Sequence, residues 1–223
     1  MQPPLFFATT HGGTSWQRGT QGLKSANSHA ENCVLSTLHL ALVGASTRAA
    51  AMSARRAGLQ VIAFDLFADR DAAPSTVCAA TFSSIDAPLT RALRQSPDTP
   101  WMYVGGVENH PELIESWAKS APLWGNGGEV VRAVRDPHRL SAVLQREGLR
   151  YPRIASPTTD RSASRWLRKP RRSGGGRGIV FWNPGDPIDP EKEYLQEYLV
   201  GRSLSGVWVA DHQTVHLLGV TEQ

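Results

Sequence analysis

Cysteine and long apolar runs are scarce in this 223-residue chain. The two cysteines, Cys33 and Cys78, lie far apart and form no Cys-x-x-Cys pair, which excludes a zinc motif of known spacing and a disulfide framework. We therefore expect a reducing, cytoplasmic environment. No apolar run reaches the roughly 18 residues of a membrane span, and the first residues lack the pattern of a signal peptide. The composition, 40% hydrophobic and 20% charged, is that of an ordinary globular protein.

The histidines give no clear metal-binding pattern either. The chain has seven, scattered along its length. His212 and His216 are four residues apart, but on a strand this spacing does not by itself create a shared site. We predict no metal site within this sequence.

Positive charge is concentrated in one stretch of the chain. Residues 131–180 contain thirteen Arg and Lys against three acids, although the whole chain carries a net charge of only +4. Such a block indicates a polyanion as partner, either nucleotide phosphates or nucleic acid. A solvated basic face is the alternative that charge alone leaves open.

The front half of the chain has the pattern of a parallel α/β domain. Residues 1–36 are rich in small polar residues without periodicity, and we expect them to be disordered. Buried-strand patterns at 38–46, 60–67 and 100–106 then alternate with helix patterns at 47–58, 85–96 and 110–120. We therefore predict a doubly wound, Rossmann-like domain over 37–125.

The pattern changes in the second half. A helix is expected over 135–148, with Asp136 as its N-cap and Pro137 in its first turn. Beyond it, short strand patterns are separated by Gly or Pro, which favours antiparallel pairing. They lie at 165–170, 178–182, 194–200, 204–211 and 214–220. We predict an α+β region with antiparallel strands over 126–223.

Two segments of this region have residue types suited to holding a nucleotide. Lys169 ends a strand, and Gly174, Gly175, Gly176, Arg177 and Gly178 follow before the next strand. Glycines let backbone N–H groups approach phosphate oxygens, and lysine supplies a compact positive charge. A flexible hairpin without a ligand is the alternative. Downstream, Gln196, Glu197, Tyr198 and Leu199 end a strand whose backbone could meet an adenine edge.

In this order the segments resemble the ATP-grasp superfamily, in particular its carboxylate-amine ligases and a carboligase-like branch. The resemblance covers roughly residues 38–223. It implies that 37–125 is the domain preceding ATP-grasp, that Lys169 contacts the phosphates, and that 174–178 is a flap over them. It also implies that 196–199 is the adenine hinge, that ATP and Mg²⁺ are used, and that an amine attacks an acyl phosphate made from a carboxylate. The partners would be a small-molecule carboxylate and an amine; we make no prediction of oligomeric state.

The sequence departs from the family pattern at three places. Ser203 stands where many members have a ribose-binding Glu. The helix that often opens with Asp-Lys opens with Asp136 and Pro137, which leaves Arg139 as a replacement for the auxiliary lysine. The family's magnesium ligands and catalytic Arg would lie beyond residue 223. We therefore expect a fragment with an incomplete C-terminal subdomain, which binds nucleotide without ligase turnover or serves as a scaffold.

Two rival functions have weaker support. A dinucleotide site would use Gly44 and Asp65, which lie about 20 residues apart, but only one glycine of the three-glycine fingerprint is present. A nucleic-acid site would use the basic block, with Trp166 and Trp182 stacking on bases. No known nucleic-acid-binding module accompanies them, so we disfavour nucleic acid as a partner.

Overall fold

The structure is a computed structural model that describes residues 40–67, 76–156, 165–210 and 213–222. The segment 1–36 expected to be disordered lies outside these residues. The described chain divides into two compact units, with the main boundary between Glu129 and Val130 and with parts of the C-terminal hairpin assigned to each. Each unit is described by itself below.

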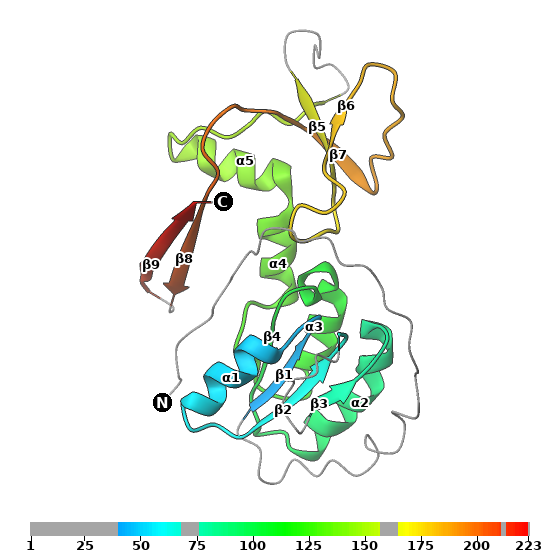
Figure 1. The fold of residues 1–223 in the computed structure, drawn as a ribbon, viewed down its shortest axis with the longest axis vertical. Coiled ribbons are helices and arrows are strands. Elements are labelled where there is room, and N and C mark those ends of the chain that lie inside the picture. The colour runs from blue at the N-terminus through cyan, green and yellow to red at the C-terminus, as the bar shows by residue number, and fades with distance from the viewer. Residues whose placement is uncertain (1–39, 68–75, 157–164, 211–212, 223) are drawn as a thin grey trace. The chain divides into compact units, whose positions relative to one another are not determined.

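The first unit is built around a four-stranded parallel sheet in the order β3-β2-β1-β4. Its elements are β1 (Leu40–Gly44), α1 (Arg48–Arg56), β2 (Val61–Asp65), β3 (Thr76–Cys78), α2 (Phe82–Gln95), β4 (Trp101–Tyr103), the short 3-10 helix η1 (Val107–Asn109) and α3 (Pro111–Ala118). Figure 1 shows the strands side by side with helices around them. The predicted Rossmann-like, parallel α/β fold is confirmed.

The core of the first unit explains why its strands read as continuous apolar runs. Every residue of β1 is buried, because the strand lies in the middle of the sheet with helices over it. Trp101 and Trp117 are fully buried and meet edge to face, with ring centroids 5.7 Å apart. Their indole N–H groups donate to Ala121 O and Asp86 Oδ1, so burying them leaves no indole donor unpaired.

Two helices separated by the single residue Asp136 follow in the chain. They are α4 (Gly128–Arg135) and α5 (Pro137–Arg146). Asp136 caps α5, as predicted, by accepting from the backbone N–H groups of His138 and Arg139. Because Pro137 lacks an N–H and restricts the residue before it, α4 ends there and a new helix begins. The helix predicted over 135–148 thus has its predicted N-cap and first residue and ends at Arg146, and α4 was not predicted.

The second unit contains a three-stranded antiparallel sheet in the order β6-β5-β7. Its strands are β5 (Trp166–Pro170), β6 (Val180–Trp182) and β7 (Glu193–Glu197). Trp166 pairs with Trp182 on one side and with Glu197 on the other. Ile154 forms an isolated bridge to β7 along its other edge, so β7 is held on both sides. The predicted antiparallel α+β architecture is confirmed.

A separate two-stranded sheet ends the described chain. It consists of β8 (Leu204–Ala210) and β9 (Val215–Glu222), close to the predicted strands 204–211 and 214–220. Within the residues that the structure describes, no helix has the length and apolar character needed to cross a bilayer.

Candidate functional site

Lysine 169 lies on one face of the β6-β5-β7 sheet. Side chains alternate along a strand and paired residues share a face, so Leu167 and Lys169 of β5 face the same way as Tyr194 and Gln196 of β7. The Lys169 ammonium donates to Gln196 Oε1 at 2.7 Å. We call this surface the lysine face.

The charge of Lys169 is held in a partly dry environment. Its side chain is part-buried, and this burial lowers the pKa of the Lys169 ammonium from its usual value of 10.5. Gln196 is 7% exposed and offers only a neutral acceptor. An ammonium held in this way is poorly compensated, and it gains most from a ligand that brings negative charge.

The glycine loop, residues 174–178, lies between β5 and β6, and its first residue is five positions after Lys169. Gly175, Gly176 and Gly178 all have positive φ, between 59° and 78°. The Arg177 N–H donates to Gly174 O, and the Ser173 hydroxyl donates to Arg177 O, which closes a compact turn. Residues 174–178 are all exposed, so the loop is a solvated hairpin tip of the kind that can approach an anionic ligand.

The segment that leads into this loop is held by hydrogen bonds from residues that the sequence analysis did not identify. Arg135, at the end of α4, donates from Nη2 to Ser173 O at 2.9 Å and to Arg171 O at 3.4 Å. Arg171 in turn donates from Nε to Pro190 O at 2.8 Å. The entry of the loop is therefore fixed to two other segments, whereas its tip is held by contacts within the turn.

The four residues predicted as a hinge lie in different environments. Gln196 is on the lysine face, whereas Glu197 lies on the opposite face in a bidentate pair with Arg153, at 2.9 and 3.1 Å. The Tyr198 N–H donates to Arg165 O at 2.8 Å, which extends the strand pairing by one residue. Leu199 is 56% exposed.

Ser203 is also exposed and directly precedes β8.

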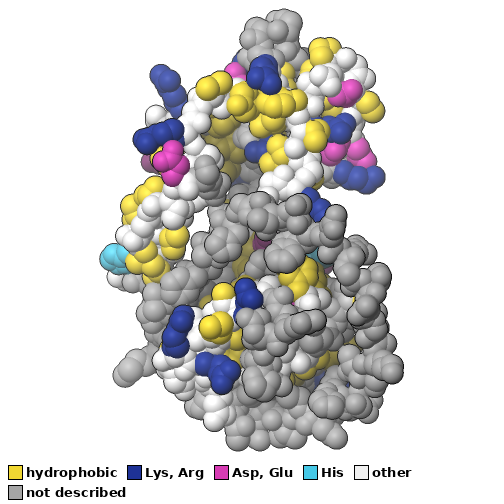
Figure 2. Space-filling view, in the orientation of Figure 1, with side chains coloured by type: hydrophobic (Ala, Val, Ile, Leu, Met, Phe, Trp, Pro, Cys, Tyr) yellow, Lys and Arg dark blue, Asp and Glu magenta, His cyan; other side chains and the backbone are white. Residues whose placement is uncertain are grey.

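The lysine face ends in an aromatic cluster beside the predicted hinge. The Arg165 guanidinium lies over the Phe181 ring, 4.1 Å from its centroid, and 5.1 Å from the centroid of Tyr198. The two rings meet edge to face at 5.0 Å. Figure 2 shows exposed apolar side chains gathered near basic ones over this unit.

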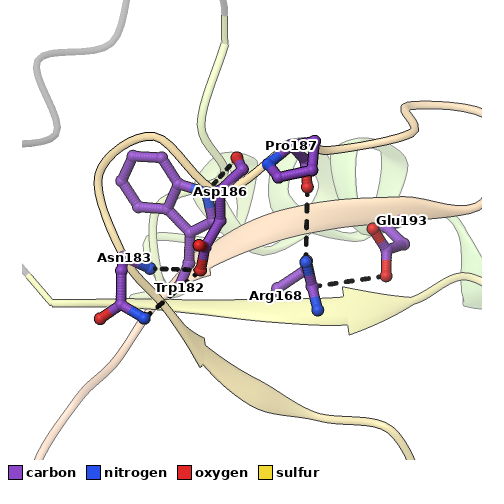
Figure 3. A network of polar contacts seen from close by, with 6 residues as sticks. All are labelled: Arg168, Trp182, Asn183, Asp186, Pro187 and Glu193. Atoms are coloured by element: carbon purple, nitrogen blue, oxygen red, sulfur yellow. Dashed lines mark hydrogen bonds and ion pairs between the residues drawn. The ribbon is translucent and has the colours of Figure 1, made fainter.

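The opposite face of the sheet is occupied by structural contacts, drawn in Figure 3. Arg168 donates from Nη1 to Pro187 O, and its Nε lies 3.5 Å from Glu193 Oε1. This second distance makes an ion pair but is too long for a hydrogen bond, and the buried Nε has no hydrogen-bond partner in the described part of the chain. Trp182 donates to Asp186 O, which closes a turn after β6.

Two of the residues proposed for the rival sites are buried. Trp166, proposed as a base-stacking residue, is 1% exposed and lies beneath the guanidinium of Arg153. Asp65, proposed as a ribose-binding acid, is also 1% exposed. Its carboxylate accepts from the backbone and hydroxyl of Thr47 and from the Phe67 N–H. It therefore fastens the start of α1 to the end of β2.

The fold and this face define a class of protein: a parallel α/β unit followed by an α+β unit with a lysine and a glycine hairpin on its sheet. Residues 123–223 match the family model of the ATP-grasp domain. The predicted resemblance to the ATP-grasp superfamily is confirmed for these residues. A search of curated proteins finds no sequence that matches it.

Solved structures with a similar fold include ligases and carboxylases. An L-amino acid ligase from Bacillus licheniformis is 16% identical with a TM-score of 0.60, over 82% of this chain and 50% of that chain. N5-carboxyaminoimidazole ribonucleotide synthetase from Thermotoga maritima is 16% identical with a TM-score of 0.57, over 83% and 53%. Biotin carboxylase from Campylobacter jejuni, in a β,γ-ATP complex, is 18% identical with a TM-score of 0.61, over 83% and 51%. The chain thus spans about half the length of these proteins.

Proposed function

We propose that this chain is the ATP-binding portion of a ligase that activates a carboxylate as an acyl phosphate for attack by an amine. The observation that carries the proposal is the part-buried ammonium of Lys169, bonded to the neutral Gln196 beside an exposed glycine hairpin. A triphosphate would supply the negative charge that this ammonium lacks, and the hairpin would supply backbone N–H donors.

The lysine face also has the length that a nucleotide requires. Lys169 lies next to the glycine loop, and Arg165 lies at the other end of the strand, beside the proposed hinge. Four residues of extended strand span about 13 Å, comparable to the reach of a nucleotide from its base to its phosphates. We therefore assign the loop 174–178 to the phosphates and residues 196–199 to the base.

Ser203, which follows the proposed hinge, is assigned to the sugar. Its hydroxyl can donate one hydrogen bond and accept others, but it has a single oxygen and cannot bind two ribose hydroxyls with separate oxygens as a carboxylate can. We further propose the division suggested by the sequence, with residues 37–125 as the domain preceding ATP-grasp and 126–223 as part of the ATP-grasp domain.

The proposed chemistry has two steps. An oxygen of the substrate carboxylate attacks the terminal phosphorus while its bond to ADP breaks. The amine nitrogen then attacks the acyl carbon, phosphate leaves, and the nitrogen loses a proton to give an amide. The residues described above would bind and orient the triphosphate, a contribution that acts by positioning.

Magnesium is implied by the family. Among the described residues, however, no group of three His, Cys, Asp or Glu side chains is placed to hold a metal ion. We therefore assign no step to a metal ligand of this chain. We place the protein in the cytoplasm, where its proposed nucleotide is abundant.

Replacing the lysine tests the proposal directly. Lys169→Ala should weaken ATP binding about 10- to 100-fold, because a charge-assisted hydrogen bond contributes about 1.5–3 kcal/mol. Lys119→Ala, which removes an exposed lysine at the end of α3, should bind like the wild type. Isothermal titration of the full chain with ATP measures both. Equal affinity in the wild type and Lys169→Ala would refute the assignment.

A further inference from the structure

Arginine 165 is held on the nucleotide side of the sheet by its backbone. Its carbonyl accepts from the Tyr198 N–H at 2.8 Å, which continues the pairing of β5 with β7. Strand alternation then places the Arg165 side chain on the same face as Leu167 and Lys169. The guanidinium is therefore fixed at the end of the lysine face opposite the phosphate-binding loop.

The Arg165 guanidinium lies close to two aromatic rings. It covers Phe181 at 4.1 Å and lies 5.1 Å from Tyr198, both measured to the ring centroids. Phe181 is 45% exposed and Arg165 is itself exposed, so planar surfaces are open to a ligand. Guanidinium planes and aromatic rings are the groups on which nucleobases stack.

We propose that Arg165, together with Phe181 and Tyr198, forms the platform on which the base of the bound nucleotide stacks. This inference rests on the nucleotide-binding function proposed above and adds two residues, Arg165 and Phe181, that sequence motifs did not identify. Arg165 acts here as a specificity-determining residue. It favours a purine, because two fused rings overlap the guanidinium plane more fully than one ring does.

The role of a stacking platform differs from that of a second phosphate ligand. A phosphate ligand needs only positive charge, which lysine also provides, whereas stacking needs the planar guanidinium. A probe without a base should respond to the loss of a phosphate ligand but not to the loss of a platform. Inorganic tripolyphosphate is such a probe.

The experiment measures the binding of ATP, UTP and tripolyphosphate to the full chain by isothermal titration. The variants are Arg165→Ala and Arg165→Lys. Arg168→Ala serves as matched control, since it removes the same residue type from the same strand but from the opposite face. Thermal melting of each variant establishes that it is folded before it is titrated.

We expect both Arg165 variants to bind ATP about 5- to 30-fold more weakly, in keeping with the usual contribution of one stacked base. Their preference for ATP over UTP should shrink, while tripolyphosphate binding and the Arg168→Ala control stay at the wild-type level. ATP binding that survives in Arg165→Lys, or a matching loss of tripolyphosphate binding, would show a charge effect and overturn the platform. Unchanged ATP binding in Arg165→Ala overturns it as well and leaves the nucleotide site standing. A wild-type chain that binds neither ATP nor tripolyphosphate overturns both proposals.

Discussion

Changing Gln196 to glutamate should convert the partner of Lys169 into a competitor for the phosphates. The amide oxygen now accepts from Nζ at 2.7 Å, and a carboxylate there would place a negative charge against the ammonium. At an effective dielectric constant of about 20, two unit charges about 4 Å apart attract by about 4 kcal/mol. Partial exposure to solvent reduces this attraction. The ion pair must still be broken before Lys169 can donate to a phosphate oxygen.

The expected loss of affinity follows from the contact that is given up. A charge-assisted hydrogen bond from Lys169 is worth about 1.5–3 kcal/mol, so Gln196→Glu should weaken ATP binding about 10- to 100-fold. Gln196→Met removes the acceptor without adding charge, and it should reduce ATP affinity less than Gln196→Glu does. Gln145→Glu introduces the same charge at an exposed position of α5 and should leave the affinity unchanged.

Isothermal titration of these three variants at fixed ionic strength distinguishes competition from positioning. Equal losses in Gln196→Glu and Gln196→Met would mean that Gln196 acts only by orienting the lysine. Affinity in Gln196→Glu at or above the wild-type level would refute the reasoning, because the carboxylate would then not compete with the phosphates.

Three further predictions concern the loop and its lysine. Gly178→Ala should reduce the free energy of unfolding by about 1–2 kcal/mol, measured by urea denaturation, because Gly178 has a φ of +78° and its Cβ would lie 3.0 Å from Pro170. Arg135→Met should speed tryptic cleavage within residues 171–178 several-fold by releasing the entry of the loop, whereas Arg139→Met should not. ATP affinity should fall as pH rises through the lowered pKa of Lys169, which lies below its usual 10.5, because only the charged ammonium binds phosphate. Isothermal titrations with ATP at pH values up to 10.5 measure this fall, and the ATP affinity of Lys169→Ala should not change with pH over the same range.

Sequence patterns predicted most of the fold because the main elements follow simple periodicities. The strand at 40–44 is buried on both faces and reads as an apolar run, and the Asp136-Pro137 pair marks the start of a helix. The elements that were missed are those with weak local signals. Strand β3 has only three residues, and α4 contains three valines, whose β-branched side chains lower helix propensity.

Only those parts of the candidate site that are close together in sequence were predicted. Lys169 and the glycine loop are neighbours in sequence, so their proximity could be inferred. The contact between Lys169 and Gln196 joins residues 27 apart, and it depends on the antiparallel register of β5 and β7. The contact from Arg135 to Ser173 spans 38 residues. The stacking of Arg165 on Phe181 likewise requires the pairing of β5 with β6.

The pairing of β7 along both of its edges determines where the chain can bend. Glu197 and Tyr198 each donate a backbone N–H to a neighbouring segment, to Arg153 O and Arg165 O. Residues 198–203 then have no regular secondary structure before β8 begins. The backbone pairing that holds β7 on both edges therefore ends at Tyr198, where the chain leaves the sheet. Of the residues proposed to hold the base, Gln196, Glu197 and Tyr198 are therefore held by strand pairing, whereas Leu199 belongs to the irregular segment.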